Sequence, residues 1–222
     1  MATENRVALV AGATGLVGRE ILAILLADKR YSRVHVLGRR KTDLQHPKLE
    51  QHVVDFARLP ALPAIDDVFI ALGTTIKVAG SQEAFRAIDF DAVLAVARTG
   101  IAAGATKLGA ISALGANPES SVFYSRVKGE AEQALAQCGY RSLVLARPAM
   151  LAGDRESLGQ AARPGERMGL ALTRALRPLI PANYRSIAAA DVAAALVKAV
   201  RESQAGVHYL ESGAMQGASG RL

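Results

Sequence analysis

The sequence predicts an α/β fold: a doubly wound parallel sheet with helices on both faces. Two observations carry this prediction. Short apolar runs alternate with helical patterns along most of the chain, which is typical of parallel strands joined by helices. The first run, Val7 to Ala11, is uninterrupted, as expected for a strand buried on both faces, and a helical pattern from Leu16 to Ala27 follows it.

The same alternation locates the other elements in order. Further strands are expected at residues 34–38, 51–54, 67–72, 106–111, 142–146 and 207–210, and helices at 83–103, 124–137 and 187–203. In such sheets, ligands bind outside the carboxyl ends of the strands. The residues expected along that edge, beside the turn that follows the first strand, are Asp55, Gly73, Thr74, Ser112 and Pro148.

Two regions depart from the alternation. Segment 153–186 carries several prolines and arginines, and we expect a substrate-side lid or insertion there. The tail from Ser212 to Leu222 is small and polar, and we expect it to be loosely held. With 222 residues, half of them apolar, the whole chain 1–222 is expected to form one domain.

The amino-acid composition limits the kinds of molecule that the protein is expected to bind. The one cysteine, Cys138, excludes an intrachain disulfide and favours a cytoplasmic protein, and no apolar run is long enough to span a membrane. The net charge is +7, but aromatic residues are only 5% of the chain, which argues against nucleic acid. We expect a small-molecule partner. The arginines between Arg155 and Arg185 indicate solvated surface or a pocket for an anionic group, and a homodimer is left open.

Three glycines, Gly12, Gly15 and Gly18, follow the first strand. At this spacing they allow a tight turn, a close approach of the backbone to a pyrophosphate, and close packing of the next helix on its strand. The free N–H groups and the positive dipole end of that helix then face the phosphates. The turn therefore predicts a dinucleotide site.

Arg39 and Arg40 follow the second expected strand. NAD-binding units carry an acidic residue there, about 20 positions after the glycines, to bind the ribose 2′-hydroxyl, and this sequence has no carboxylate nearby. A guanidinium pair suits a 2′-phosphate by charge and by geometry. The pair therefore favours NADP(H); the alternative is that two arginines merely end a strand on a basic surface.

Tyr124 and Lys128 lie four residues apart on an expected helix, so both point to one face. An ammonium group beside a tyrosine favours the ionised phenol, which lets the tyrosine exchange a proton with a carbonyl or alcohol near neutral pH. Ser112, at the end of its strand, can donate a further hydrogen bond to the same oxygen. Coincidence explains any one of these features easily, but not their combination with the glycine turn.

Together, Gly12-Ala-Thr-Gly15-Leu-Val-Gly18, Ser112 and Tyr124-xxx-Lys128 resemble the short-chain dehydrogenase/reductase superfamily, which has the Rossmann-type fold. The GATGxxG form resembles its extended and atypical branches. Leu72-Gly73-Thr74-Thr75, the stretch from Arg147 to Leu151 and the short length resemble the small Tat-interacting-protein-like oxidoreductases. The resemblance covers residues 5 to 210.

This resemblance implies NADP(H)-dependent reduction of a carbonyl, or oxidation of an alcohol, with Ser112, Tyr124 and Lys128 as the catalytic set. It also implies a cofactor role for each matching position. The pyrophosphate would be bound by Gly12, Thr14, Gly15, Leu16 and Val17, with Gly18 packing the helix, and the 2′-phosphate by Arg39 and Arg40. Asp55 would lie by the adenine, Leu72, Gly73 and Thr74 on the adenosine side, Lys128 on the nicotinamide ribose, and Pro148 to Met150 against the nicotinamide.

One position departs from the family pattern. Many members carry an asparagine on the helix before the serine-bearing strand, where it supports a water relay to the lysine, but this helix has Asp89 and Asp91 instead. The proton path is therefore an open question. Two alternatives to the reductase also stay open: a nucleotide-sugar epimerase or dehydratase, and a non-catalytic protein that senses NADPH.

Other residues are weaker candidates for a functional site. His35, His46, His52 and His208 are scattered along the sequence and lack further ligands at useful spacing, so no metal is expected. Cys138 follows a helical run and is interpreted as a packing residue.

Overall fold

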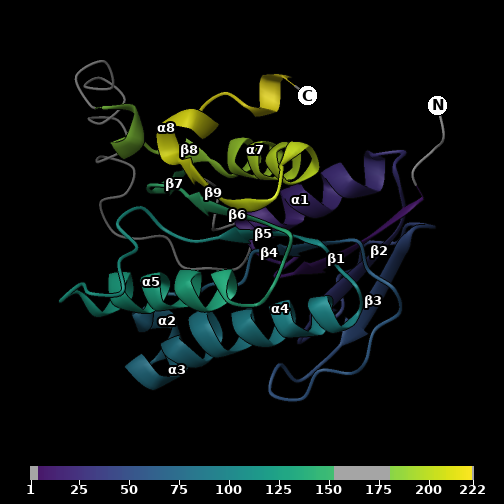
Figure 1. The fold of residues 1–222 in the computed structure, drawn as a ribbon, viewed down its shortest axis with the longest axis horizontal. Helices are drawn as coiled ribbons and strands as arrows, with labels where there is room; N and C mark the ends of the chain where they lie inside the picture. The colour runs from purple at the N-terminus through teal and green to yellow at the C-terminus, as the bar shows by residue number, and fades with distance from the viewer. Residues whose placement is uncertain (1–4, 153–180, 222) are drawn as a thin grey trace.

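Seven parallel strands form the central sheet of the computed structural model, which describes residues 5–152 and 181–221 (Figure 1). Their order in the sheet is β3-β2-β1-β4-β5-β6-β9. The strands are β1 (Arg6–Ala11), β2 (Tyr31–Gly38), β3 (Leu49–Val53), β4 (Asp67–Ile70), β5 (Lys107–Ile111), β6 (Ser142–Arg147) and β9 (Gly206–Glu211). This is the doubly wound arrangement that the sequence predicts, in a single domain.

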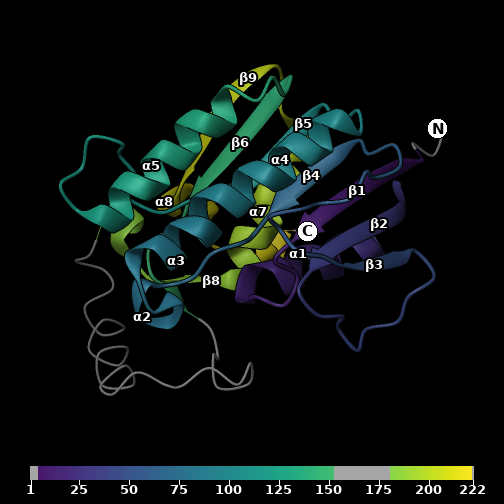
Figure 2. The same ribbon diagram turned by 90° about the horizontal axis from the view of Figure 1, so that it is seen from below.

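Helices cover both faces of the sheet (Figure 2). On one face, α1 (Leu16–Ala27) and α7 (Ala189–Glu202) pack over residues such as Val34 and Val144. On the other face, α4 (Val93–Ala102) and α5 (Phe123–Ala136) pack over a second apolar cluster that includes Leu9 and Leu108. The two apolar layers explain why these strands are uninterrupted apolar runs in the sequence.

The helix expected at 83–103 is present but is not uniform. It is built from α3 (Gln82–Arg86), a π-helix (Ala87–Ala92) and α4, and a short helix α2 (Ile76–Ala79), which the sequence pattern does not predict, precedes it. π-Helical stretches are rare and frequently occur at functional sites. Here the stretch contains Asp89, whose side chain is fully buried.

Two sequence-based expectations about the C-terminal part are wrong in detail. Ile187 does not begin the last helix, because Ile187–Ala188 form strand β8, which pairs with β7 (Leu151–Ala152). The tail is not loose: α8 (Ser212–Met215) places Met215 in the core, and the Asp191 carboxylate accepts hydrogen bonds from two tail N–H groups. The expected lid falls mostly on residues 153–180, outside the described residues.

The amino ends of β1, β2 and β4 are joined by a buried carboxylate. Asp67 accepts two hydrogen bonds from the Arg6 guanidinium, at 2.8 and 2.6 Å, and one from the Tyr31 hydroxyl at 2.8 Å. Burial and the nearby negative charge raise the pKa of Tyr31 well above its usual range. This network lies at the amino edge of the sheet. The glycine turn and the other loops of the candidate site lie at the opposite, carboxyl edge.

The glycine turn is held by close packing of the backbone. Gly12 has a φ of +91°, and a Cβ built there would lie 2.4 Å from the Ala71 carbonyl oxygen. A Cβ at Gly18 would lie 2.0 Å from the Gly12 carbonyl oxygen, whereas a Cβ at Gly15 would come no closer than 3.4 Å to any atom. Gly12 and Gly18 are therefore required by the fold itself, and Gly15 is not.

We therefore expect Gly18→Ala to destabilise the protein. The new methyl group must displace backbone of the turn, and overpacking of this kind costs about 1–3 kcal/mol of the free energy of unfolding. Gly15→Ala is the matched control, and it should cost less than about 1 kcal/mol, the effect of alanine at a helix N-cap. Urea unfolding followed by circular dichroism measures both; equal losses in the two variants would contradict the packing argument.

Candidate active site

Several of the predicted site residues lie at the carboxyl ends of β4, β5 and β6. Ser112 directly follows β5, and its N–H donates to the Ala146 carbonyl of β6 at 2.7 Å. Pro148 directly follows β6, and its carbonyl accepts from the Leu114 N–H at 3.0 Å. These bonds fix the start of the β5–α5 loop against the end of β6 and so hold Ser112 in place.

Ser112 is positioned as a hydrogen-bond donor. Its hydroxyl is buried and has no hydrogen-bond partner among the residues that the structure describes. A buried hydroxyl without a hydrogen-bond partner lowers the stability of the fold, so a ligand that hydrogen-bonds to Ser112 would remove this cost. Ser112 is therefore a candidate for contact with a ligand. Ser112 lines a small cavity together with Asp89, Lys128 and Glu132.

Tyr124 and Lys128 both lie on α5, one helical turn apart, as predicted. The Lys128 side chain is only 7% exposed and lines the cavity, whereas Tyr124 is half-buried, with its ring 5.5 Å from that of Phe85 on α3. The structure thus brings Ser112 and Lys128 to one cavity. Tyr124 does not line that cavity; it lies one helical turn before Lys128 and packs against Phe85.

The Lys128 ammonium is already paired. Its Nζ lies 2.7 Å from Oδ1 of Asp89, and the other carboxylate oxygen of Asp89 accepts the Thr74 N–H at 2.9 Å. A buried charge of either sign is expensive alone, so each group accounts for the burial of the other. Gly73 lies against this pair, because a Cβ there would be 3.4 Å from Asp89 Oδ1 and 3.8 Å from Lys128 Nζ.

Asp89 is therefore a residue of the candidate site. From the sequence alone it was apparent only as a departure from the family pattern, in which this helix carries an asparagine. Asp91, two residues later, is exposed and takes no part in the pair. In the sequence, Asp89 stands between two apolar residues, Ile88 and Phe90. The π-helical turn selects Asp89 rather than Asp91, and local sequence does not predict that turn.

The start of α1 presents backbone rather than side chains. Leu16 and Val17 are buried in the core, so any contact with a ligand must come from their N–H groups, while Thr14 is exposed. The first turn of α1 has no acidic residue, so nothing there opposes the positive end of the helix dipole. This end of the edge can hold an anion at the backbone.

Beyond the end of β2, Arg39 and Arg40 are exposed, and neither makes a hydrogen bond or ion pair with another described residue. Asp55, two residues after β3, is also exposed, and its side chain accepts the Ala57 N–H at 3.0 Å within a local turn. The two guanidinium groups are therefore available to an external anion. At the other end of the edge, Met150 is 62% exposed.

Two other residues with chemically active side chains are structural: Arg147 at the carboxyl edge, and Cys138, which follows α5 at the opposite edge of the sheet. Arg147 makes two hydrogen bonds to the Glu132 carboxylate, which raises the pKa of the guanidinium further, and its side chain stacks on Tyr209. Burial raises the pKa of the Cys138 thiol, which keeps it from acting as a thiolate and agrees with a packing role. Within the described ranges, no helix is long and apolar enough to cross a membrane.

Comparison with known sequences gives clear relatives. HTATIP2 from Rattus norvegicus is 35% identical over 170 residues, which are 73% of this chain and 68% of that protein. FMP52-1 from Scheffersomyces stipitis, named as mitochondrial, is 32% identical over 158 residues, which are 68% of this chain and 69% of that protein. No protein-family model matches the chain.

Solved structures share the fold. MoeE5 in complex with UDP-glucose and NAD superposes with a TM-score of 0.67 at 17% identity, covering 92% of this chain and 75% of that one. WbmF from Bordetella bronchiseptica in complex with NAD⁺ gives a TM-score of 0.66 at 20% identity, covering 100% of this chain and 78% of that one. At these identities the likeness concerns the fold.

The relatives overturn the expected cytoplasmic location. FMP52 proteins from Scheffersomyces stipitis, Emericella nidulans and Coccidioides immitis are all named mitochondrial. The expectation was wrong because it rested on Cys138, and a single cysteine excludes an intrachain disulfide without selecting a compartment.

Proposed function

This chain belongs to the family of the HTATIP2 and FMP52 proteins, within the short-chain dehydrogenase/reductase superfamily, and we propose that it is an NADP(H)-dependent oxidoreductase. Its substrate is a small molecule, of which it reduces a carbonyl group or, in reverse, oxidises an alcohol. The observation that carries the proposal is the unpartnered, buried hydroxyl of Ser112 at the carboxyl end of β5. The cavity of about 10 Å³ that it lines with Lys128 has room for about one water molecule, so the substrate itself would lie outside that cavity. A substrate oxygen would accept the hydrogen bond that the Ser112 hydroxyl can donate.

A nicotinamide dinucleotide fits the edge beside this cavity. The proteins MoeE5 and WbmF, which share the fold, are solved with NAD bound. In this chain, a Cβ at Gly15 would meet little of the protein, so the backbone there is open to close approach, and the first turn of α1 carries no acidic side chain. Both features suit a pyrophosphate. When bound, the nicotinamide would supply or take up the hydride.

In this proposal, a residue of the protein donates the proton that the substrate oxygen receives. In the reducing direction the substrate carbon gains the hydride, and its oxygen gains the proton of the Tyr124 hydroxyl. The resulting phenolate is reprotonated from solvent before the next turnover. Ser112 donates a hydrogen bond to the same oxygen and so stabilises the negative charge that develops on it.

Asp89 positions Lys128 in this scheme. The 2.7 Å ion pair holds the lysine side chain in the cavity and offsets its charge. The Thr74 N–H donates a hydrogen bond to the same carboxylate, so the loop after β4 also helps to position Asp89.

The preference for NADP(H) rests on Arg39 and Arg40, which are exposed and available to a 2′-phosphate. Replacing both by alanine should weaken NADPH binding by about tenfold or more, because each charge-assisted hydrogen bond contributes about 1.5–3 kcal/mol. NADH binding should change by less than about twofold, since NADH has no phosphate at that position. Fluorescence titration of both cofactors measures this; tighter binding of NADH by the wild type would refute the assignment.

Tyr124→Phe tests whether the protein is an enzyme. Loss of the general acid should lower kcat in a carbonyl-substrate screen by about 10²–10⁴-fold, while NADPH affinity stays unchanged. Tyr209→Phe, on exposed β9, is the matched control and should retain activity. Unchanged activity in Tyr124→Phe would remove that residue from the mechanism. Cofactor binding with no turnover of any carbonyl would favour the NADPH sensor, and substrate isomerisation without net NADPH consumption would favour the epimerase.

Asp89→Asn tests the positioning role. Asparagine can still accept the Thr74 N–H, but it leaves the Lys128 charge without its counter-charge. Removing this negative charge disfavours protonation of the groups around it, so the pH at which alcohol oxidation is half-maximal should move to lower pH. Exposed Asp91→Asn is the control and should leave the pH profile in place. An unshifted profile in a folded Asp89→Asn protein would show that Asp89 is only structural.

A further inference from the structure

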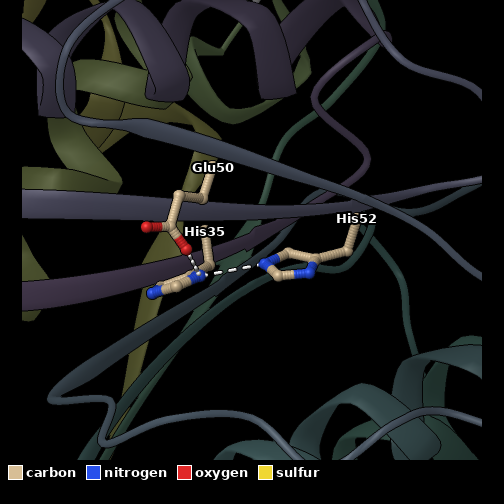
Figure 3. A group of neighbouring side chains, drawn as sticks. All are labelled: His35, Glu50 and His52. Atoms are coloured by element: carbon tan, nitrogen blue, oxygen red, sulfur yellow. Dashed lines mark hydrogen bonds and ion pairs between the residues drawn. The ribbon is translucent and has the colours of Figure 1, made fainter.

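Away from the carboxyl edge, three potential metal ligands meet on β2 and β3 (Figure 3). Nδ1 of His35 lies 2.9 Å from Nε2 of His52 and 3.3 Å from Oε2 of Glu50. One ligand atom from each of the three residues lies within 4.8 Å of the other two. No other such group of histidine, cysteine and acidic side chains occurs among the described residues.

The strand register brings these side chains together. His35 on β2 is paired with Glu50 on β3, and alternate residues of a strand share a face, so His52 lies on the same face as Glu50. Gln51, between them, bonds instead to the Thr42 segment. The sequence-based view of scattered histidines is therefore wrong for His35 and His52, because parallel pairing places side by side residues that are far apart in sequence.

We propose that His35, Glu50 and His52 form a binding site for a divalent transition-metal ion of the zinc class. Two imidazole nitrogens and a carboxylate oxygen are a ligand set that zinc commonly takes. Zinc bonds to such atoms are about 2.0–2.2 Å long, so ligand atoms around a tetrahedral ion lie roughly 3.4 Å apart. The observed separations of 2.9 and 3.3 Å are close to this spacing.

The charges around the cluster are compatible with a cation. Arg33 pairs with Oε1 of Glu50 and leaves Oε2 facing His35. The Glu50 side chain is 40% exposed, so water can complete the coordination on the open side.

Two features limit the affinity. Arg33 places a positive charge near the ion, and Nε2 of His35 has no acceptor among the described residues, although metal-bound imidazoles normally donate their second N–H. We therefore expect micromolar rather than tighter binding. A bound ion would tie the edge strand β3 to β2, just before the segment that carries Arg39 and Arg40. The site is independent of the proposed oxidoreductase activity.

Calorimetric titration of the full chain with zinc chloride tests the site, using His52→Gln and Glu50→Gln as variants. Both side chains are partly exposed, so these variants should fold. Wild type should bind one zinc ion per chain, and each variant should bind at least about tenfold more weakly, a loss that even changes outside the direct ligands can cause. His208→Gln is the control, because His208 lies on β9, far from the cluster in the sheet order, and its ring bonds a nearby backbone carbonyl.

Cobalt(II) supplies a second readout. Bound at the same residues, it should show the intense visible absorption of a tetrahedral nitrogen–oxygen site in wild type and His208→Gln, and lose it in His52→Gln. Zinc should also raise the melting temperature of wild type but not of His52→Gln, because only the bound native state is stabilised. Absence of zinc binding by wild type, or binding that His52→Gln and Glu50→Gln leave unchanged, would overturn the proposal.

Discussion

The ion pair between Asp89 and Lys128 is the interaction on which the arrangement of the carboxyl edge depends. It joins the π-helical stretch to α5, and the Thr74 N–H adds the loop after β4 to the same carboxylate. Both charges are almost fully withdrawn from water, so removing either would strand the other at a cost of several kcal/mol. Gly73 of the same loop lies beside the pair, at a distance where a Cβ would make ordinary van der Waals contact with both charged groups.

Around this pair, the edge separates into parts with different chemistry. The start of α1 offers backbone N–H groups without a competing carboxylate, and the end of β2 offers two exposed guanidinium groups. The cavity between α5 and the sheet offers a buried hydroxyl and a paired ammonium. A dinucleotide needs an anion site at its centre and a reactive group at one end, and this order along the edge matches those needs.

The sequence predicts the local elements of the fold well, and fails where distant segments meet. The Val7 to Ala11 strand and the Leu16 to Ala27 helix are found within a residue of their expected bounds, because apolar periodicity and glycine spacing are local signals. Asp89 and the pairing of His35 with His52 were missed, because each depends on a partner from another element. The tail was misjudged because its small residues are held by Asp191, on a helix far back in the sequence.

By itself, therefore, the sequence determined the doubly wound fold, the glycine turn, and the presence of Ser112, Tyr124 and Lys128 at the edge where strands end. Repeating apolar patterns and strained backbone positions act within a few residues, so they can be read without the rest of the chain. The tertiary structure alone decided which charges face each other. A buried charge must find its counter-charge in space, and parallel strand register and a π-helical turn supply partners such as Asp89 for Lys128, and Glu50 and His52 for His35.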